Sequence, residues 1–462
     1  MPNLKPIVNV TVSNQEQLLL NDRRTIRWGI VAPANATGLS VGDVVQFTNL
    51  TDAYATLGRD TSNGNLAIRY IELAFAQNSR SVINYSYPGK NIDSVTTTTI
   101  NNVGGYPAGT TLITVADATG IVLGDYITID TGEKEMMRKV LLVAGNNITV
   151  DRLDYDIDNG VAVVKLTMFD ASTNIPLCRT ALANEEFRIY VEDSYGSTLW
   201  TSLATWLDTR DENELYTQAF CGSEFAQTSA GFSSAIITLN NMFIYPIYGL
   251  GVERQDNRLY NGNYLAVSTA SRYARELSAY NQYENAFISM NSLEVENIKD
   301  VISPETGEHF TDRFADELID LNMSIVKPMV VQGKSVVAIR KLITSYNEDE
   351  AGNPSTDYTM MAGPNINILY QTTMKTLINT VLARQVENRE PINNNNIQIL
   401  VSEVHAKLKN AQYVDKNVLS GGFEPSTTYS FTGTTGEVEI EQRFKGIDSI
   451  DRVFVKAYRL FQ

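Results

Sequence analysis

The sequence predicts a mixed α/β core that is interrupted by an all-β insert and flanked by extended segments at both ends. Three observations predict this architecture. Buried-strand patterns alternate with helical patterns before residue 91 and again after residue 170. Between these positions the chain is rich in Thr, Val and Gly, and short β patterns recur between turn residues. The outermost segments show the alternation of single strands.

The two end segments each present one face of aliphatic residues. Residues 1–15 and 451–462 are predicted to be β strands, because aliphatic residues recur in them at every second position. The alternating residues are Val8, Val10, Val12, Val453, Val455 and Ala457. For the first segment, an ordinary edge strand of its own domain is an equally good interpretation.

Residues 16–90 mix strands and helices. Asp52 is the expected N-cap of a short helix, because aspartate accepts hydrogen bonds from first-turn amides, and Gly58 is expected to end that helix. The predicted elements are a strand at 27–32, helices at 53–57 and 65–77, and a strand at 81–85. Pro88 and Gly89 stop the last strand.

Residues 91–170 show no convincing helical pattern. The predicted strands are 112–115, 126–129, 139–143 and 148–150, with turn residues between them. Short strands at regular spacing are typical of small all-β domains. The segment therefore predicts a β-barrel or β-sandwich inserted in the mixed fold.

From residue 171 onward the mixed pattern returns. We expect helices at 199–207, 263–283, 311–321, 366–387 and 401–413. We expect strands at 215–220, 243–245, 247–248, 326–329, 335–343 and 451–461. The dipeptide Gln332-Gly333 is the predicted turn between the fourth and fifth of these strands.

The composition is that of an ordinary globular protein. Of 462 residues, 43% are hydrophobic and 19% charged, which suits roughly two to four domains with cores that need no covalent staples. The only two cysteines, Cys178 and Cys221, exclude a disulfide framework and fit folding in the cytoplasm. The opening residues lack an apolar signal region, and the longest apolar runs are too short to span a bilayer.

The net charge of −16 argues against nucleic acid as a partner. Acidic residues outnumber basic ones 53 to 37, and affinity for a phosphate backbone depends on counterion release by Lys and Arg. The sequence contains no local basic stripe. Like charge also keeps a self-associating protein soluble before it assembles.

Groups suited to catalysis or cofactor binding are scarce. His309 and His405 are the only histidines, and metal sites and nucleophilic triads depend on His or Cys. We expect both histidines to be surface or helix residues. Residues 332–335 resemble the end of a phosphate-binding loop, but Pro328 stands where that loop needs a glycine. The sequence thus predicts no enzyme activity, no metal site and no cofactor.

Residues 154–160 resemble the start of a calcium-binding loop. The glycine of that motif falls one place late, at Gly160, and the twelfth position is Lys165 instead of a bidentate glutamate. The alternative is a hairpin turn at 158–160 that leads into a strand at 161–164. We favour the turn.

One segment carries a specific order of strand, loop and helix. A strand ends in Ile343-Thr344-Ser345-Tyr346, the loop 351–354 has the sequence Ala-Gly-Asn-Pro, and a long helix is predicted at 366–387. This order resembles contractile-tail sheath proteins of the Mu-like type. In that family a strand ending in Ile-Thr-Thr-Tyr precedes an Ala-Gly-x-Pro loop, and a Tyr leads into a long helix.

The N-terminal region is similar to the same family. Residues 47–58 match an aromatic residue, a short loop and a helix ending in Leu-Gly, and residues 64–85 match the helix and strand that follow. Residues 1–6 differ, because they stand where the family begins with Pro-Gly-Val-Tyr. The β-rich insert resembles peripheral domains that phage sheath and tail proteins carry on their outer surface.

The resemblance implies a structural subunit. In the family, six subunits form a ring around a tail tube, the rings stack helically, and terminal arms pair as strands with sheets of neighbouring subunits. The implied partners are further copies of the chain, the tail tube protein, and baseplate and tail terminator proteins, without nucleic acid or direct membrane insertion. The implied location is the virion, in a phage tail that assembles in the host cytoplasm. Contraction needs no nucleotide, and it would drive the tube through the host envelope.

On this interpretation the chain divides into six parts. They are an N-terminal arm (1–15), a first part of the sheath core (16–90), an inserted β-rich peripheral domain (91–170), a second part of the core (171–335), a C-terminal domain that faces the tube (336–450) and a C-terminal arm strand (451–462).

Two alternatives remain for the whole chain, and one for a local patch. The chain could be another virion structural protein, such as a baseplate or tail-tube component, or a hydrolase with a carboxylate site. Lys407 and Lys409, together with His405 on the predicted helix 401–413, are candidate tube-facing residues. A solvated helix face is the alternative for that patch.

Overall fold

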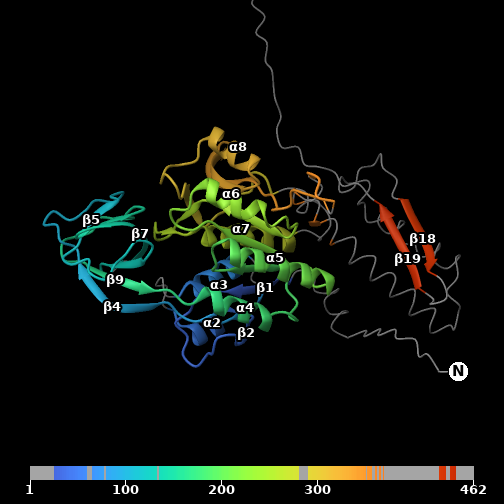
Figure 1. Cartoon of the computed structure of the whole chain (residues 1–462), viewed down its shortest axis with the longest axis horizontal. Coiled ribbons are helices and arrows are strands. Elements are labelled where there is room, and N and C mark those ends of the chain that lie inside the picture. The colour runs from blue at the N-terminus through green and yellow to red at the C-terminus, as the bar shows by residue number, and fades with distance from the viewer. Residues whose placement is uncertain are drawn as a thin grey trace, which may run out of the picture. The chain divides into compact units, whose positions relative to one another are not determined.

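The computed structural model describes most of the chain, in two compact units. The first unit comprises residues 25–278 and 290–359, and the second comprises 1–24, 279–289 and 360–462. The described residues are 25–59, 65–77, 80–132, 135–279, 290–349, 351–355, 359, 361, 364, 365, 368, 426–432 and 437–443. Figure 1 shows the elements in chain order by colour.

An eight-stranded sheet organises the first unit, in the order β17-β16-β12-β11-β10-β1-β3-β2. The strands from β16 to β3 run parallel, and β17 and β2 add antiparallel edges. Their bounds are β1 Arg27–Val31, β2 Val44–Phe47, β3 Val82–Ser86, β10 Ile189–Glu192, β11 Gln218–Gly222, β12 Ile244–Tyr248, β16 Ser324–Val331 and β17 Lys334–Lys341. Strands β10, β11 and β12 are buried along their whole length, as is typical of parallel strands covered on both faces.

Helices cover both faces of this core sheet. The described helices are α2 Leu50–Leu57, α3 Leu66–Gln77, α4 Ala171–Ala181, α5 Ser197–Glu212, α6 Ser229–Ile237, α7 Gly262–Ala279 and α8 Asp312–Asp320. Phe220 of β11 packs on Tyr273 of α7, with ring centroids 5.7 Å apart. Tyr190 of β10 packs on Trp206 of α5 at 4.8 Å. Tyr190 pairs with Ala219, the neighbour of Phe220, so the two rings point to opposite faces. Among the described helices, none is both long and apolar enough to cross a bilayer.

Helix α2 begins earlier than the sequence predicts. Its N-cap is Asn49, whose side-chain oxygen accepts a hydrogen bond from the Asp52 amide at 2.9 Å. The prediction of Asp52 as the N-cap is therefore wrong, and Asp52 lies in the first turn. Both residue types cap helices, and the extended backbone of Asn49 at the boundary decides between them. Gly58 ends the helix with a φ of 80°, as predicted.

Residues 92–167 form a six-stranded antiparallel sheet that closes on itself, and we call this sheet the barrel. Its strands, in sheet order, are β4 Ile92–Thr99, β9 Ala162–Thr167, β6 Tyr126–Asp130, β7 Glu135–Ala144, β8 Asn147–Val150 and β5 Leu112–Thr114. A backbone bridge between Ile100 and Val115 closes the ring, with the Asn101 amide donating to the Thr114 carbonyl at 2.9 Å. A cluster of buried aliphatic side chains fills the interior.

The barrel strands follow the sequence pattern only in part. Strands β5, β6 and β8 match predicted strands to within one residue at each end, and β7 contains the strand predicted at 139–143 but begins at Glu135. Strand β4 was not predicted, because it contains a run of threonines and few large apolar residues. The turn predicted at residues 158–160 is present, with Gly160 at φ 84°, and it leads into β9.

A three-stranded sheet lies beside the barrel and the core sheet. It consists of β13 Leu250–Glu253, β14 Leu259–Tyr260 and β15 Ile298–Ile302, in the order β14-β13-β15. Leu250, Val252 and Leu259 of this sheet share one buried apolar cluster with Met137 and Leu166 of the barrel. The barrel therefore packs against the core instead of hanging from it by its two connections alone.

Strands β16 and β17 form a hairpin at the edge of the core sheet, as the sequence predicts. Gln332 and Gly333 have φ values of 50° and 79°, the two positive values that a tight two-residue hairpin turn requires. The next residues, Lys334 and Ser335, belong to β17. The resemblance to a phosphate-binding loop is thus explained by a hairpin.

In the second unit the structure describes an antiparallel hairpin. Strand β18 (Ser426–Thr432) pairs with β19 (Glu437–Arg443) along its whole length. The helix predicted at 366–387 lies outside the described residues except for Ile368, and the elements predicted at 401–413 and 451–461 lie outside them entirely.

Candidate functional site

The predicted intersubunit residues and the predicted tube-facing residues lie outside the part of the chain that the structure describes. They are Val8, Val10, Val12, Val453, Val455, Ala457, His405, Lys407 and Lys409. These assignments stay predictions. The described residues instead define the carboxyl ends of the parallel strands, the segment with the sheath-like motif, the joint of the barrel and a charged junction beside it.

The end of β10 holds a buried ion pair. Arg179 of α4 contacts both carboxylate oxygens of Glu192, at 2.5 and 2.8 Å, and both side chains are buried. The hydroxyls of Tyr190 and Ser194 donate to the same carboxylate at 2.7 and 2.5 Å. The Glu192 carboxylate raises the pKa of Arg179 against the opposing effect of burial. A bidentate pair of this kind fixes α4 on the sheet.

The next residue, Asp193, points to the opposite face. It accepts hydrogen bonds from Tyr195 at 3.1 Å, from Tyr70 of α3 at 3.2 Å and from the Asn263 side chain of α7 at 3.4 Å. Burial raises the pKa of Asp193, and these neutral donors partly offset that rise. The carboxylate therefore joins α3 and α7 to the end of β10.

The start of α7 lies directly against β11. A Cβ atom on Gly222 would be only 1.9 Å from the Gly262 carbonyl carbon, so two glycines are needed where these backbones meet. The Gly222 amide donates to the Asn263 side chain at 2.8 Å. In open α/β sheets, ligands bind outside the carboxyl ends of the strands. Here the protein's own helix and side chains occupy the ends of β10 and β11.

His309 and the carboxylates of the calcium-like segment 154–160 make contacts within the fold. Exposed His309 contacts the Asp300 carboxylate at 3.0 Å. In the calcium-like segment, Asp154 pairs with Arg138, while Asp156 accepts from the Ala108 amide at 2.8 Å. The carboxylates of that segment therefore face different partners. Within the described residues, no group of three or more His, Cys, Asp or Glu side chains is arranged to hold a metal ion.

The segment with the sheath-like motif is fastened to the core. The side-chain oxygen of Asn240 accepts from the amides of Asn347 and Glu348 at 2.8 and 2.9 Å. The Asp349 carboxylate closes the following loop by accepting from the amides of Ala351 and Asn353 at 2.9 and 2.8 Å. These bonds, chiefly the one from Asn353, lower the pKa of Asp349. The Ala-Gly-Asn-Pro sequence thus forms a defined loop.

The joint of the barrel contains a buried guanidinium. Arg138 of β7 pairs with Asp154, and its Nε lies 3.7 Å from Asp151. Its guanidinium carbon lies 5.9 Å from the ring centroid of Phe225 in the core. Asp154 also accepts from the amide of Leu259 at 3.1 Å. Burial raises the pKa of Asp151 to about 6, against the effect of Arg138. The barrel thus contacts the core both through this charged group, by way of Phe225 and Leu259, and through the apolar cluster described above.

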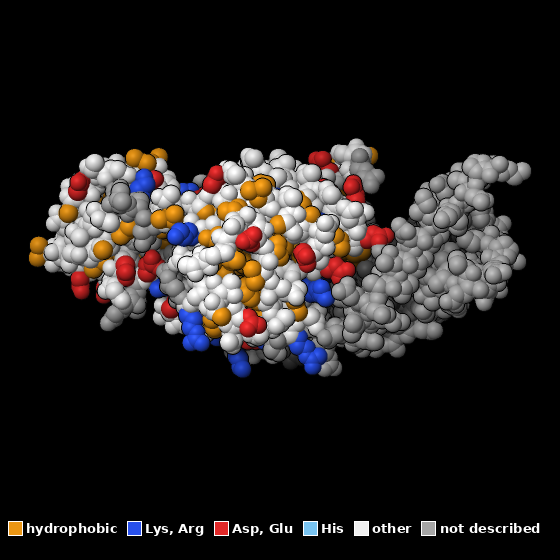
Figure 2. Space-filling view, turned by 90° about the horizontal axis from the view of Figure 1, so that it is seen from below, with side chains coloured by type: hydrophobic (Ala, Val, Ile, Leu, Met, Phe, Trp, Pro, Cys, Tyr) orange, Lys and Arg blue, Asp and Glu red, His pale blue; other side chains and the backbone are white. Residues whose placement is uncertain are grey.

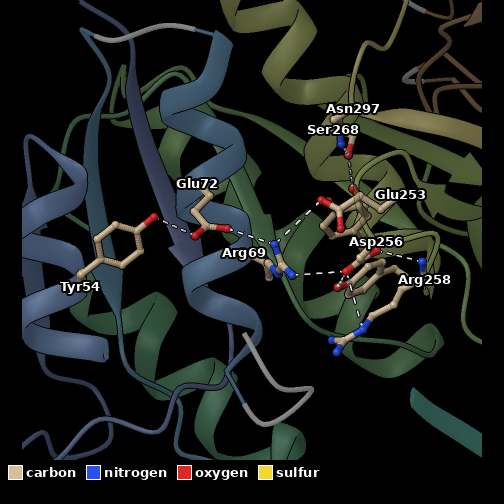
Figure 3. Close-up of polar contacts among 10 residues, drawn as sticks. Tyr54, Arg69, Glu72, Glu253, Asp256, Arg258, Ser268 and Asn297 are labelled. Atoms are coloured by element: carbon tan, nitrogen blue, oxygen red, sulfur yellow. Dashed lines mark hydrogen bonds and ion pairs between the residues drawn. The ribbon is translucent and has the colours of Figure 1, made fainter. Parts of the chain in front are cut away.

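A charged junction links α3 to the hairpin of β13 and β14 (Figure 3). Arg69 of α3 contacts Glu72 and Asp256 at 3.4 Å each and Glu253 at 4.0 Å. The Tyr54 hydroxyl of α2 donates to Glu72 at 2.8 Å. The junction therefore connects α2, α3 and the segment after β13 through one guanidinium.

The surface gives no continuous stripe of one charge on the face seen in Figure 2. Acidic, basic and apolar side chains are interspersed there, and the basic ones lie apart from one another. That face offers a nucleic-acid backbone no basic track.

Solved structures with a similar fold belong to contractile assemblies. The sheath tail protein of Desulfitobacterium hafniense matches with a TM-score of 0.50 and 10% identity, over 92% of this chain and 97% of that chain. A chain of the contracted helical sheath of the anti-feeding prophage gives 0.51 and 10% identity, over 94% and 93%. A chain of the anti-feeding prophage baseplate gives 0.55 and 7% identity, over 95% and 94%. No protein-family model and no curated protein matches the sequence.

The fold is that of the contractile tail sheath proteins. The resemblance predicted from the strand, loop and helix around residues 335–358 is thus confirmed at the level of the fold. At 7–12% identity the similarity carries the fold alone. The matched chains come from a sheath tail protein, a helical sheath and a baseplate.

Proposed function

We propose that this chain is the subunit of a contractile tail sheath, which polymerises as stacked hexameric rings around a tail tube and contracts to drive the tube through a host envelope. The observation that carries the proposal is the shared fold over more than nine-tenths of both chains in each comparison. The −16 charge is compatible with a subunit that stays soluble before assembly.

The connection between subunits would be made by added strands. Among the strands that the structure describes, β18 and β19 pair with each other, and the proposal places further strands at the outer edges of this hairpin. A two-stranded hairpin alone is marginally stable in water. We assign the terminal arms of neighbouring copies as the strands that complete this hairpin. Main-chain hydrogen bonds would keep subunits linked while their bodies shift.

The alternation of the N-terminal arm gives a matched test. Changing Val8, Val10 and Val12 to Asp alters one face, and changing Asn9 and Thr11 to Asp alters the other. If the valine face fills pockets on a neighbour, only the first variant loses long polymers in negative-stain electron microscopy while circular dichroism is unchanged. Equal polymer formation by both variants contradicts the arm assignment. Deletion of residues 1–14 or 452–462 should leave a folded monomer that does not polymerise.

A patch on the predicted helix 401–413 would face the tube. Lys407 and Lys409 are the proposed contacts, so reversing both to Glu should reduce polymer formation on purified tubes without affecting self-assembly. Unchanged tube-templated assembly would assign these lysines to a solvated helix face instead.

The second candidate is a baseplate component, because one similar chain comes from a baseplate. Electron microscopy of the purified protein separates the two. Long hollow cylinders favour a sheath, whereas single rings or small complexes favour a baseplate. A tail tube is disfavoured, because such proteins are nearly all β, whereas the core sheet here carries helices on both faces.

A further inference from the structure

The charged junction beside α3 does not balance its charges when every carboxyl group is ionised. Three carboxylates meet there, from Glu72, Glu253 and Asp256, and two guanidinium groups, from Arg69 and Arg258, face them. Arg69 is divided among all three carboxylates, and the Arg258 Nε lies 3.7 Å from Asp256. One additional proton would make the cluster neutral.

The buried oxygen atoms show where this proton belongs. Glu253 is 5% exposed. Its Oε1 accepts from the Tyr264 hydroxyl of α7 at 2.8 Å. Its Oε2 is buried, and no donor among the described residues is directed at it. The neighbouring carboxyl group of Asp256 is within hydrogen-bonding reach. Two ionised carboxylates would repel each other here, whereas a protonated Glu253 can donate a hydrogen bond to the Asp256 carboxylate.

We propose that Glu253 and Asp256 share one proton in the folded chain, and that loss of this proton as pH rises loosens the junction among α3, the β13–β14 hairpin and α7. The groups that face the pair are Arg69 and Glu72 from α3, Arg258 and Tyr260 from the hairpin, and Tyr264 from α7. Tyr54 of α2 acts only through Glu72.

Glu253 and Asp256 lie on the hairpin that contacts the barrel, so loss of the shared proton should affect more than these two residues. Val252 and Leu259, which flank the turn containing Asp256, belong to the apolar cluster that holds the barrel. The Leu259 amide also donates to Asp154 of the barrel. The Ser268 hydroxyl of α7 accepts from Asn297, next to β15, at 2.8 Å (Figure 3). Repulsion between the two carboxylates would therefore act on the hairpin that joins the barrel to the core.

The direction of the pH effect follows from linkage. Burial and the Asp256 carboxyl group raise the pKa of Glu253 to about 7 from its usual 4.5. In the unfolded chain Glu253 loses its proton at lower pH than in the folded chain. The folded state therefore holds the extra proton between these two values, and its stability falls as pH rises through this window.

Glu253→Gln tests the proposal in the full chain. Glutamine resembles the protonated form, keeps an acceptor for Tyr264 and can donate to Asp256. We expect its folding constant in urea titrations to exceed that of the parent roughly tenfold near pH 8 and to agree within about twofold near pH 5. Hydrogen exchange of segments 66–77 and 250–260 should rise with pH beyond the intrinsic rate in the parent only.

Two further variants complete the test. Glu294→Gln removes a carboxylate from the nearby surface pair with Arg254, which lies outside the junction, and should keep the pH slope of the parent. Asp256→Asn removes the other member of the pair and should abolish the slope as Glu253→Gln does, which covers the case in which the first variant does not fold. A ratio to the parent that stays constant across the pH range, in whichever variant folds, overturns the shared proton.

Discussion

The core sheet and the barrel differ in what is buried inside them. The core buries charged and polar side chains, such as Arg179, Glu192 and Asp193, at the ends of its parallel strands. The barrel interior is a cluster of aliphatic residues, and its buried Arg138 lies at the joint with the core. A buried polar group lowers the stability of the fold unless its hydrogen-bonding or charged partner is present. The stability of an apolar interior depends instead on how fully its side chains fill the available volume. The core should therefore lose stability when one member of a buried polar pair is removed. The barrel should lose stability when a substitution leaves a cavity in its interior.

The close contact of two backbones gives the largest expected effect. Gly222→Ala places a Cβ atom 1.9 Å from the Gly262 carbonyl carbon, and neither backbone can move without displacing α7. We expect a loss of at least about 3 kcal/mol in the free energy of unfolding, or failure to fold. Gly104→Ala in a barrel turn is the control, because its nearest neighbour would be 3.9 Å away. Equal stability of the two variants would show that the α7 contact is not tight.

The buried ion pair gives the next largest effect. Arg179→Met leaves the carboxylate of Glu192 buried without its guanidinium, and losing one partner of such a pair costs about 3–5 kcal/mol. Arg313→Met removes one partner of the pair with Glu317 on the surface of α8 and should change stability by less than about 0.5 kcal/mol. Urea unfolding of both variants measures the difference. If Arg179→Met and Glu192→Gln together restore the stability, the pair contributes specificity more than stability.

A cavity in the barrel ranks third. Ile127 is fully buried in the apolar cluster, and Ile127→Ala should cost about 2–4 kcal/mol. Val103, which is 95% exposed on a barrel turn, provides the control, since Val103→Ala removes almost no buried area. Hydrogen exchange should show the loss in the barrel strands first. An equal increase throughout the core would mean that barrel and core unfold as one cooperative unit.

Much of the core fold could be predicted from the sequence because its strands are short apolar runs bounded by turn residues. The β16–β17 hairpin is the clearest case, since Gln332-Gly333 lies between two strand patterns and only a tight turn fits there. The parallel strands β1, β3, β11, β12 and β16 were predicted for the same reason, because burial on both faces leaves such strands nearly continuous in apolar residues. Strand β10 is equally buried but was not predicted.

The polar interior could not be predicted in the same way. Glu192 is the last residue of β10 and Asp193 follows it, but no strand was predicted there, and two successive carboxylates are equally typical of a solvated turn. Arg69 and Asp256 meet across 187 positions of sequence, and no local pattern pairs two charges at such a separation. The N-cap was assigned to Asp52 because Asn49 and Asp52 both favour that position, and only the backbone conformation separates them.

A substitution in the surface loop of the sheath-like motif should give the smallest effect. It allows a surface site to be compared with the interiors of the core and the barrel. Asp349→Asn weakens the acceptors for the amides of Ala351 and Asn353, because charge-assisted hydrogen bonds are stronger than neutral ones. We expect hydrogen exchange of segment 346–355 to rise roughly threefold near pH 6, with no change in the core strands.

The same loop should respond to pH. The pKa of Asp349 is lowered in the folded chain, so the contribution of Asp349 to stability is present above the usual carboxyl value and is lost as pH falls through the folded value. Once the pH lies below the folded value, the parent should therefore behave like the variant, after correction for intrinsic exchange. A parent loop whose protection is unchanged on acidification would assign its order to Asn240, which binds the amides of Asn347 and Glu348 without any titratable group.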